Sequence, residues 1–206
     1  MTQNIADLYR ARHEKVLTPI AANVERYLTE ILRGEPRIDR VSVRAKSLAS
    51  FVAKAGKVEH GAPKYSSPLL DIQDQIAGRI ITFYLSDVER VKQKITEYFG
   101  AIEAHRKEPE SSSEFGYEGH HYILFLPEEA FQSVDRANAP KVFELQIRTL
   151  FQHAWSEGNH DLSYKSLVPL TRDHLRRAAF TAAQAWGADM IFEELSTQLI
   201  GNGTSH

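Results

Sequence analysis

Three polar side chains occur at alternating positions of the segment VFELQIRT, residues 142–149. Side chains in a strand alternate between two faces, so the apolar residues of this segment share one face and Glu144, Gln146 and Arg148 share the other. A solvated edge strand would usually carry Thr, Lys or Ser at such positions. A carboxylate, an amide and a guanidinium in one row instead indicate a surface that performs chemistry.

A second carboxylate, Asp74, comes directly before an apolar segment that predicts a buried strand at residues 79–85. Two carboxylates on neighbouring strands of one sheet can hold Mg²⁺ when substrate phosphates supply the remaining oxygen ligands. In the alternative interpretation, Asp74 caps the segment that follows it and Glu144 pairs with Arg148. The spacing of the residues leaves both interpretations open.

Positive charge is concentrated between residues 40 and 65, although the chain as a whole has a net charge of −2. Against the single acid Glu59, this stretch carries Arg40, Arg44, Lys46, Lys54, Lys57 and Lys64. At RAKS a predicted strand meets a predicted helix, and such a junction presents backbone N–H groups and cations to phosphates. A solvated surface is the alternative. Because Gly-rich phosphate-binding motifs are absent from the sequence, a nucleotide here would be held by side chains.

Aromatic and histidine residues provide further candidates. Tyr117 lies between glycines in FGYEGHHY, where its ring can stack on a base or anchor a turn. His121 could face a phosphate, bind a metal or lie hydrogen-bonded in the core. His153, Glu157 and His160 follow a spacing that places three ligands on one helix face, as in a metallohydrolase, but the chain supplies no clear partner ligands for such a site.

Composition limits the class of protein. The chain has 206 residues, of which 42% are hydrophobic and 25% charged, which suits one folded domain with helical additions. It has no cysteine, so disulfides, thiolate zinc sites and cysteine nucleophiles are excluded. No apolar run reaches the length of a membrane span, and the N-terminus has no signal-like segment. We therefore expect a cytoplasmic protein with no membrane partner.

Hydrophobic spacing predicts the elements that position these residues. Residues 3–33 are expected to be helical, with a restart or kink at Thr18-Pro19, where Thr18 would be the N-cap. Ser86 and Glu89 are expected to form a capping box. The other predicted elements are helices at about 48–58, 86–99, 149–165 and 171–199 and strands at about 37–47, 79–85, 120–127 and 142–148.

These elements predict an α+β (α/β) fold, in which a small mixed sheet of four to five strands is flanked by helices. We expect one domain over residues 1–206, with a core at about 40–165 and helical extensions at 3–33 and 171–199.

Five segments, taken in order, resemble the synthetase domain of RelA/SpoT proteins. They are RAKS, DIQDQIAGRII, GYEGHHYILF, FELQIRT and HAWSEGNHDLSYK. The chain length matches the small alarmone synthetases of this family. The resemblance implies a fold related to polymerase-β-type nucleotidyltransferases. It also implies an ATP-dependent pyrophosphokinase that transfers the β,γ-pyrophosphate of ATP to the 3′-hydroxyl of GDP or GTP and makes (p)ppGpp.

The resemblance implies roles for the polar residues of the predicted strands. Asp74 matches the magnesium-binding aspartate, and Glu144 matches the catalytic glutamate that aligns or deprotonates the acceptor hydroxyl and helps to hold Mg²⁺. Gln146 and Arg148 would contact the acceptor substrate. On the acceptor side, Tyr117 would stack on guanine and His121 would lie four residues further along.

The resemblance also implies a donor site for ATP. The arginine of the family's Arg-x-Lys pattern packs against adenine and its lysine meets phosphate, and these positions are Arg44 and Lys46 here. The other implied ATP-binding residues are Ser47, Lys54, Lys57 and Arg79. The resemblance leaves a homo-oligomer open.

The acceptor segment departs from the family pattern. Typical members carry a lysine and an asparagine in K-P-N-G-Y, whereas this chain has Ser113, Glu114 and Phe115 before its tyrosine, and Glu118 after it. Added carboxylates beside an anionic substrate are unfavourable, which leaves two alternatives open: another acceptor, such as a tRNA 3′ end or an adenosine nucleotide, or a non-catalytic module that senses nucleotides or binds a partner.

Overall fold

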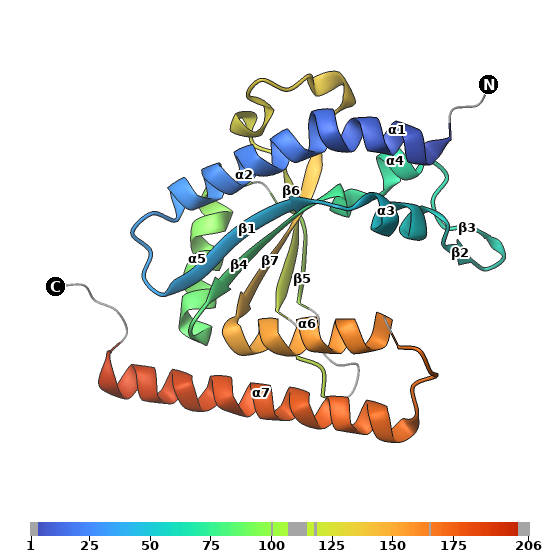
Figure 1. Ribbon diagram of the computed structural model, residues 1–206. Coiled ribbons are helices and arrows are strands. Elements are labelled where there is room, and N and C mark those ends of the chain that lie inside the picture. The colour runs from blue at the N-terminus through green and yellow to red at the C-terminus, as the bar shows by residue number, and fades with distance from the viewer. Residues whose placement is uncertain (1–3, 100, 107–114, 118, 165, 202–206) are drawn as a thin grey trace.

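The computed structural model describes residues 4–99, 101–106, 115–117, 119–164 and 166–201. At its centre is a five-stranded sheet with the order β1-β4-β7-β6-β5 (Figure 1). The strands are β1 (Ile38–Ala45), β4 (Ile76–Thr82), β5 (Ala101–Arg106), β6 (His120–Phe125) and β7 (Val142–Thr149). β4 and β7 are parallel, and the other neighbouring pairs are antiparallel. The predicted mixed sheet flanked by helices is confirmed.

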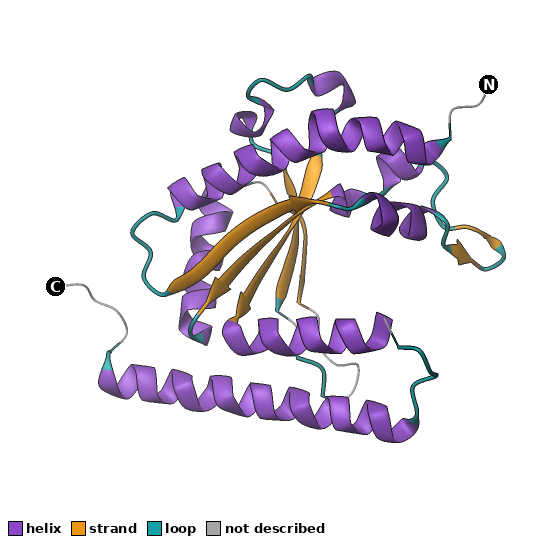
Figure 2. Ribbon diagram, in the orientation of Figure 1, coloured by secondary structure: helices purple, strands orange, loops and turns teal. Residues whose placement is uncertain are grey.

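Helices lie on both faces of the sheet (Figure 2). The first face is covered by α2 (Thr18–Ile31) and α5 (Leu85–Tyr98), whereas α6 (Leu150–Tyr164) lies over the other, and α7 (Arg172–Leu199) packs on α6 and also contacts α5. The core forms on the first face, where Phe143, Leu145 and Ile147 are 0% exposed and pack with apolar residues of α2 and α5. Burial of these apolar side chains drives folding and leaves the opposite face of β7 for polar groups.

The N-terminal helix continues through Pro19 without a restart. α1 (Ile5–Arg12) leads into a π-helical turn, His13–Leu17, and then into α2. The Thr18 N–H donates to the His13 carbonyl, and Thr18 itself has helical angles, so the prediction of an N-cap at Thr18 is wrong. The wider π turn shifts the hydrogen-bond pattern just before Pro19, so the missing proline N–H does not break the helix.

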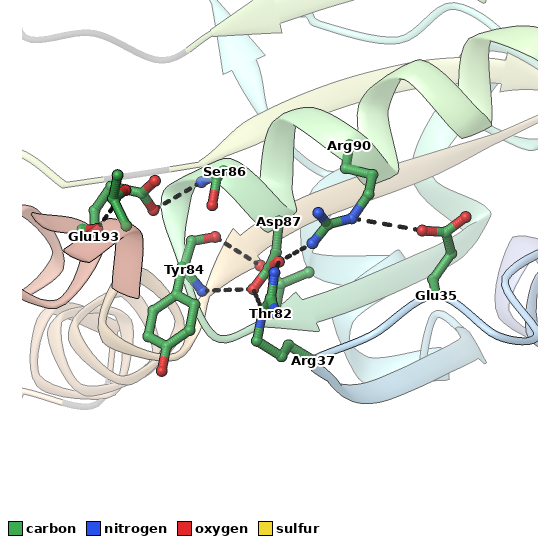
Figure 3. A network of polar contacts seen from close by, with 9 residues as sticks. Glu35, Arg37, Thr82, Tyr84, Ser86, Asp87, Arg90 and Glu193 are labelled. Atoms are coloured by element: carbon green, nitrogen blue, oxygen red, sulfur yellow. Dashed lines mark hydrogen bonds and ion pairs between the residues drawn. The ribbon is translucent and has the colours of Figure 1, made fainter. Parts of the chain in front are cut away.

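The start of α5 also differs from the prediction. Tyr84, and not Ser86, is the N-cap, and its N–H donates to Asp87 at 3.1 Å (Figure 3). Asp87 is 0% exposed and pairs with Arg37 at 2.9 Å and with Arg90. A buried carboxylate with two guanidinium partners fixes this corner more strongly than the predicted Ser86–Glu89 box would. The Ser86 N–H is used elsewhere, because it donates to Glu193 of α7 at 3.0 Å.

β4 begins at Ile76, three residues before the start predicted at Arg79. Gly78 is buried in the strand, where a Cβ atom would lie 3.0 Å from Leu145 Cδ1. Glycine here permits the close packing of β4 on β7, and it does not end the strand.

Shorter elements occupy the connections. A small hairpin follows α3, formed by β2 (Val58–Glu59) and β3 (Ala62–Pro63), and its turn has positive φ at His60 and Gly61. The remaining elements are α3 (Leu48–Ala55), α4 (Pro68–Asp71), η2 (Gln73–Gln75), η3 (Glu128–Phe131) and η4 (Arg136–Asn138). In the described parts of the chain, no helix combines the length and apolar character needed to cross a membrane.

Candidate active site

The strand register arranges polar residues in rows on the face opposite the core. One row runs across four strands through Arg44, Ala77, Glu144 and Ile123, and the next runs through Ser42, Arg79, Gln146 and His121. The parallel pairing of β4 with β7 is what brings Arg79 beside Gln146. The turn η2, which carries Asp74, directly precedes β4 and contacts β7.

Asp74 lies between two lysine ammonium groups. Its Oδ2 atom accepts from Lys46 Nζ at 2.8 Å and pairs with Lys54 Nζ at 2.9 Å. Its Oδ1 atom is buried and has no hydrogen-bond partner among the described residues. These contacts go to side chains and not to a helix end, so Asp74 does not act as the cap of the alternative interpretation. An oxygen of this kind, beside cations that attract phosphates, suits a divalent cation.

Glu144 is held in its charged form. Burial acts to raise the pKa of this carboxyl, but hydrogen bonds from His121 and Gln146 and the charge of Lys54 outweigh burial and lower the pKa to about 2. The distance from His121 Nδ1 to Glu144 Oε1 is 3.2 Å. Lys54 therefore acts on both carboxylates, since it also pairs with Asp74.

Arg148 contacts the ring nitrogen of His121 that does not face Glu144. Its side chain is buried, and its Nη atoms contact Ser156 Oγ at 2.7 Å and His121 Nε2 at 3.1 Å. Because a guanidinium can only donate, His121 Nε2 must accept, and the ring proton must lie on Nδ1, which faces Glu144. The structure thus gives Arg148 a contact other than the expected one with substrate. It fixes the tautomer of the histidine that binds Glu144.

Most of the predicted donor residues lie just before, within or just after α3. Ser47 is the N-cap of α3, and its hydroxyl accepts from the Ser50 N–H at 3.3 Å. Lys46 and Lys54 point to Asp74, whereas the side chains of Arg44 and Lys57 are exposed. The stretch RAKS therefore forms the predicted strand–helix junction, and its Lys46, together with Lys54 of α3, is directed at Asp74.

Arg79 connects this face to α6. Its guanidinium pairs with Glu157 at 2.9 Å, and the ion pair lowers the pKa of Glu157 against the opposing effect of burial. Burial lowers the pKa of the nearby His153, and the charges of Arg79, Arg40 and Arg148 act in the same direction. Within the described ranges, no group of three or more His, Cys, Asp or Glu could hold a metal ion, so the metallohydrolase alternative has no support.

Tyr117 is tied to the C-terminal helix. Its hydroxyl donates to Asp189 Oδ2 at 2.7 Å, and the Thr149 hydroxyl at the end of β7 donates to the same oxygen at 2.6 Å. The sequence analysis missed Asp189. The sequence indicated this residue only by its spacing. Asp189 is seven residues from both Ala182 and Ser196, so it is a lone carboxylate on the same helix face as these small residues. Ser113, Glu114 and Glu118 lie outside the described residues.

The fold and the site together define a class of proteins. A mixed sheet carries a carboxylate at the start of one central strand and another on its parallel neighbour, with lysines on the adjoining helix. Residues 43–168 match the family described as "Region found in RelA / SpoT proteins". The chain therefore belongs to the RelA/SpoT family, which confirms the resemblance drawn from its sequence.

Individual relatives agree with this assignment. The chain is 28% identical over 188 residues to GTP pyrophosphokinase YjbM of Bacillus subtilis (strain 168), with 83% of each chain covered. Its fold is similar to that of small alarmone synthetase 1 from Bacillus subtilis, with a TM-score of 0.72, 20% identity and coverage of 94% and 98% of the two chains. A structure of the latter bound to its product pppGpp has a TM-score of 0.65, 23% identity and coverage of 93% and 94%.

Proposed function

We propose that this protein transfers the β,γ-pyrophosphate of ATP to the 3′-hydroxyl of GDP or GTP and makes (p)ppGpp. The observation that carries the proposal is that Lys54 acts on Asp74 and Glu144 together, so that a cation-rich phosphate surface adjoins a charged carboxylate suited to an acceptor hydroxyl. The curated relative named GTP pyrophosphokinase supports the same reaction.

Mg²⁺ is the proposed cofactor, held by Asp74 with help from Glu144. The buried Oδ1 of Asp74, which has no partner among the described residues, fits such an ion, because Mg²⁺ favours one or two carboxylates together with substrate phosphates. When bound, Mg²⁺ would neutralise charge on the triphosphate during transfer.

The donor triphosphate would lie along the cationic side chains of β1, α3 and β4. Lys46 and Lys54 would turn from Asp74 to the phosphates, and Arg79 would exchange Glu157 for a phosphate oxygen. By resemblance, Arg44 would pack against adenine, where its exposed side chain is free to move, and Ser47 and Lys57 would lie beside the phosphates.

Glu144 would align the acceptor hydroxyl. With a pKa of about 2 it is fully charged at neutral pH and is a weak base, so it accepts the hydrogen bond of the 3′-hydroxyl and points the oxygen at the β-phosphorus. The new bond joins this oxygen to the β-phosphorus, the bond from that phosphorus to the α,β-bridging oxygen breaks, AMP leaves, and the hydroxyl proton is released to water. His121 and Gln146 hold Glu144 in place for this step.

The acceptor base would stack on Tyr117, near the end of the sheet where β6 begins and β7 ends. Transfer to an adenosine nucleotide or to a tRNA 3′ end uses the same donor chemistry and remains the alternative for this site.

Incubation with labelled ATP and each of GDP, GTP, AMP, ADP and tRNA tests the proposal. We expect labelled ppGpp or pppGpp together with AMP. Transfer to tRNA or an adenosine nucleotide alone would change the acceptor, and binding of nucleotides without any transfer would favour a sensing module.

A further inference from the structure

Asp189 is a buried carboxylate in α7, a helix whose other buried side chains are small. It is 1% exposed, and the other buried residues of α7 are Ala182 and Ser196. An ionised carboxylate in such a place is costly unless hydrogen bonds satisfy it. Burial raises the pKa of Asp189, and the hydrogen bonds of Thr149 and Tyr117 oppose that rise.

Two hydroxyl groups donate to Asp189, one from Thr149 at the end of β7 and one from Tyr117 shortly before β6. Thr149 ends β7 and is 0% exposed, and it forms a reciprocal capping box with Gln152 of α6, with distances of 2.9 and 3.1 Å. The Thr149 hydroxyl therefore has a fixed direction, in which it accepts from Gln152 and donates to Asp189. Tyr117 reaches the same carboxylate oxygen from the segment that leads into β6.

The backbone after Tyr117 is pressed against the end of β7. A Cβ atom at Gly119 would lie 2.5 Å from both Arg148 Cγ and the Ile147 carbonyl oxygen. Such close approach requires glycine at this position. The backbone at Gly119 is thus fixed against the end of β7, and the hydrogen bond to Asp189 fixes the side chain of Tyr117.

We propose that Asp189 is a positioning residue that holds the ring of Tyr117 as a platform for the acceptor base. This inference rests on the proposed function, in which Tyr117 stacks on guanine. It extends the acceptor site to α7, which lies beyond the residues 43–168 that match the family. Asp189 does not touch the substrate. It acts by orienting the ring through the phenol hydroxyl, so its removal affects acceptor binding and leaves donor binding intact.

The test is a double-mutant cycle with Tyr117→Phe and Asp189→Ala, with GDP binding and ATP binding measured by calorimetry and KM values measured for both substrates. We expect each single variant to weaken GDP binding about tenfold, equal to about 1.4 kcal/mol, with unchanged ATP binding. In the Tyr117→Phe background, Asp189→Ala should have no further effect on GDP. Glu193→Gln is the matched control, because Glu193 also ties α7 to the core, through Ser86.

Three outcomes overturn the proposal. Unchanged GDP binding in Tyr117→Phe would show that the hydroxyl does not position the ring, and this variant keeps the test valid if Asp189→Ala fails to fold. Equal losses for GDP and ATP in Asp189→Ala, or a GDP effect of the same size in Glu193→Gln, would show general docking of α7. Wild-type protein that binds GDP but does not transfer contradicts the proposed function alone, whereas wild-type protein that does not bind GDP contradicts both.

Discussion

The guanidinium of Arg79 on β4 lies 2.9 Å from the carboxylate of Glu157 on α6. In the proposed function, this arginine must bind a donor phosphate, so Glu157 occupies it until ATP arrives. Both side chains are partly exposed, at 25% and 48%, so their pairing is worth about 1 kcal/mol or less.

Glu157→Gln should therefore lower the KM for ATP by up to about fivefold, with little change in the KM for the acceptor. Steady-state kinetics with each substrate varied in turn measure this effect. The control is Glu30→Gln, which removes an exposed carboxylate of α2 that pairs with Arg33. A raised KM for ATP would instead indicate that Glu157 orients Arg79 for the phosphate.

Asp74→Asn and Glu144→Gln should each reduce transfer by about 10²- to 10⁴-fold, because one removes the proposed metal ligand and the other the group that aligns the hydroxyl. The measurement is single-turnover formation of labelled product, with circular dichroism to show that each variant is folded. Near-normal turnover in either folded variant would contradict the proposed mechanism.

His121 should exist as the neutral tautomer with its proton on Nδ1, because Arg148 donates to Nε2 and Glu144 accepts from Nδ1. Proton–nitrogen correlation NMR of the histidine rings reports this directly. In Arg148→Met the ring loses the donor that fixes it, so we expect a mixture of tautomers and a lower kcat. The Nε2–H tautomer in the wild-type protein would exclude the arrangement of these three residues.

The low pKa of Glu144 makes stability depend on pH. A carboxyl whose pKa is about 2 in the folded state and 4.5 when unperturbed stabilises the fold above pH 4.5, and this contribution is lost as pH falls towards 2. The unfolding free energy of the wild type, measured relative to Glu144→Gln, should therefore fall by about 2 kcal/mol between pH 6 and pH 3. Urea unfolding of both proteins at the two pH values measures this difference, and a constant difference would contradict the shift.

GDP should be a better acceptor than GTP. Glu114 and Glu118 flank Tyr117 in the sequence, where typical relatives provide a lysine, so the additional phosphate of GTP meets more negative charge. The ratio of kcat/KM values for the two acceptors measures the preference. Glu114→Lys should reduce it, whereas Glu97→Lys, which adds the same charge on the exposed surface of α5, should not. A preference for GTP in the wild type would contradict the charge argument.

Sequence periodicity correctly predicted the elements in which each face keeps the same degree of burial from one end to the other. The alternation in VFELQIRT gave β7 with its buried and polar faces, and the long C-terminal helix has the predicted extent within one residue at its start. It misplaced the start of β4, because the need for Gly78 arises from Leu145 on another strand. The Tyr84–Asp87 cap was missed for a similar reason, since Arg37 supplies a partner from elsewhere in the chain.

The same distinction applies to the site. Residue types and their order indicated Asp74, Glu144 and the lysines, because phosphate chemistry requires these groups. The role of Arg148 behind His121 and the link from Asp189 to Tyr117 could not be predicted, since both depend on how α6 and α7 pack on the sheet. The hydrophobic periodicity of a segment does not show which of its side chains a distant helix will orient.

The order of the strands has a consequence for the folding of this chain. β7 lies between β4 and β6, although it is the last of the five strands to be synthesised. Until it is added, β1-β4 and β5-β6 are two separate antiparallel ribbons, each with an open inner edge able to pair with other chains. The connection between the two parallel strands contains α5, β5 and β6, and contacts of such long range form slowly. Enzymatic activity should therefore be the last property to appear during refolding, and a nascent chain that ends before Val142 should aggregate.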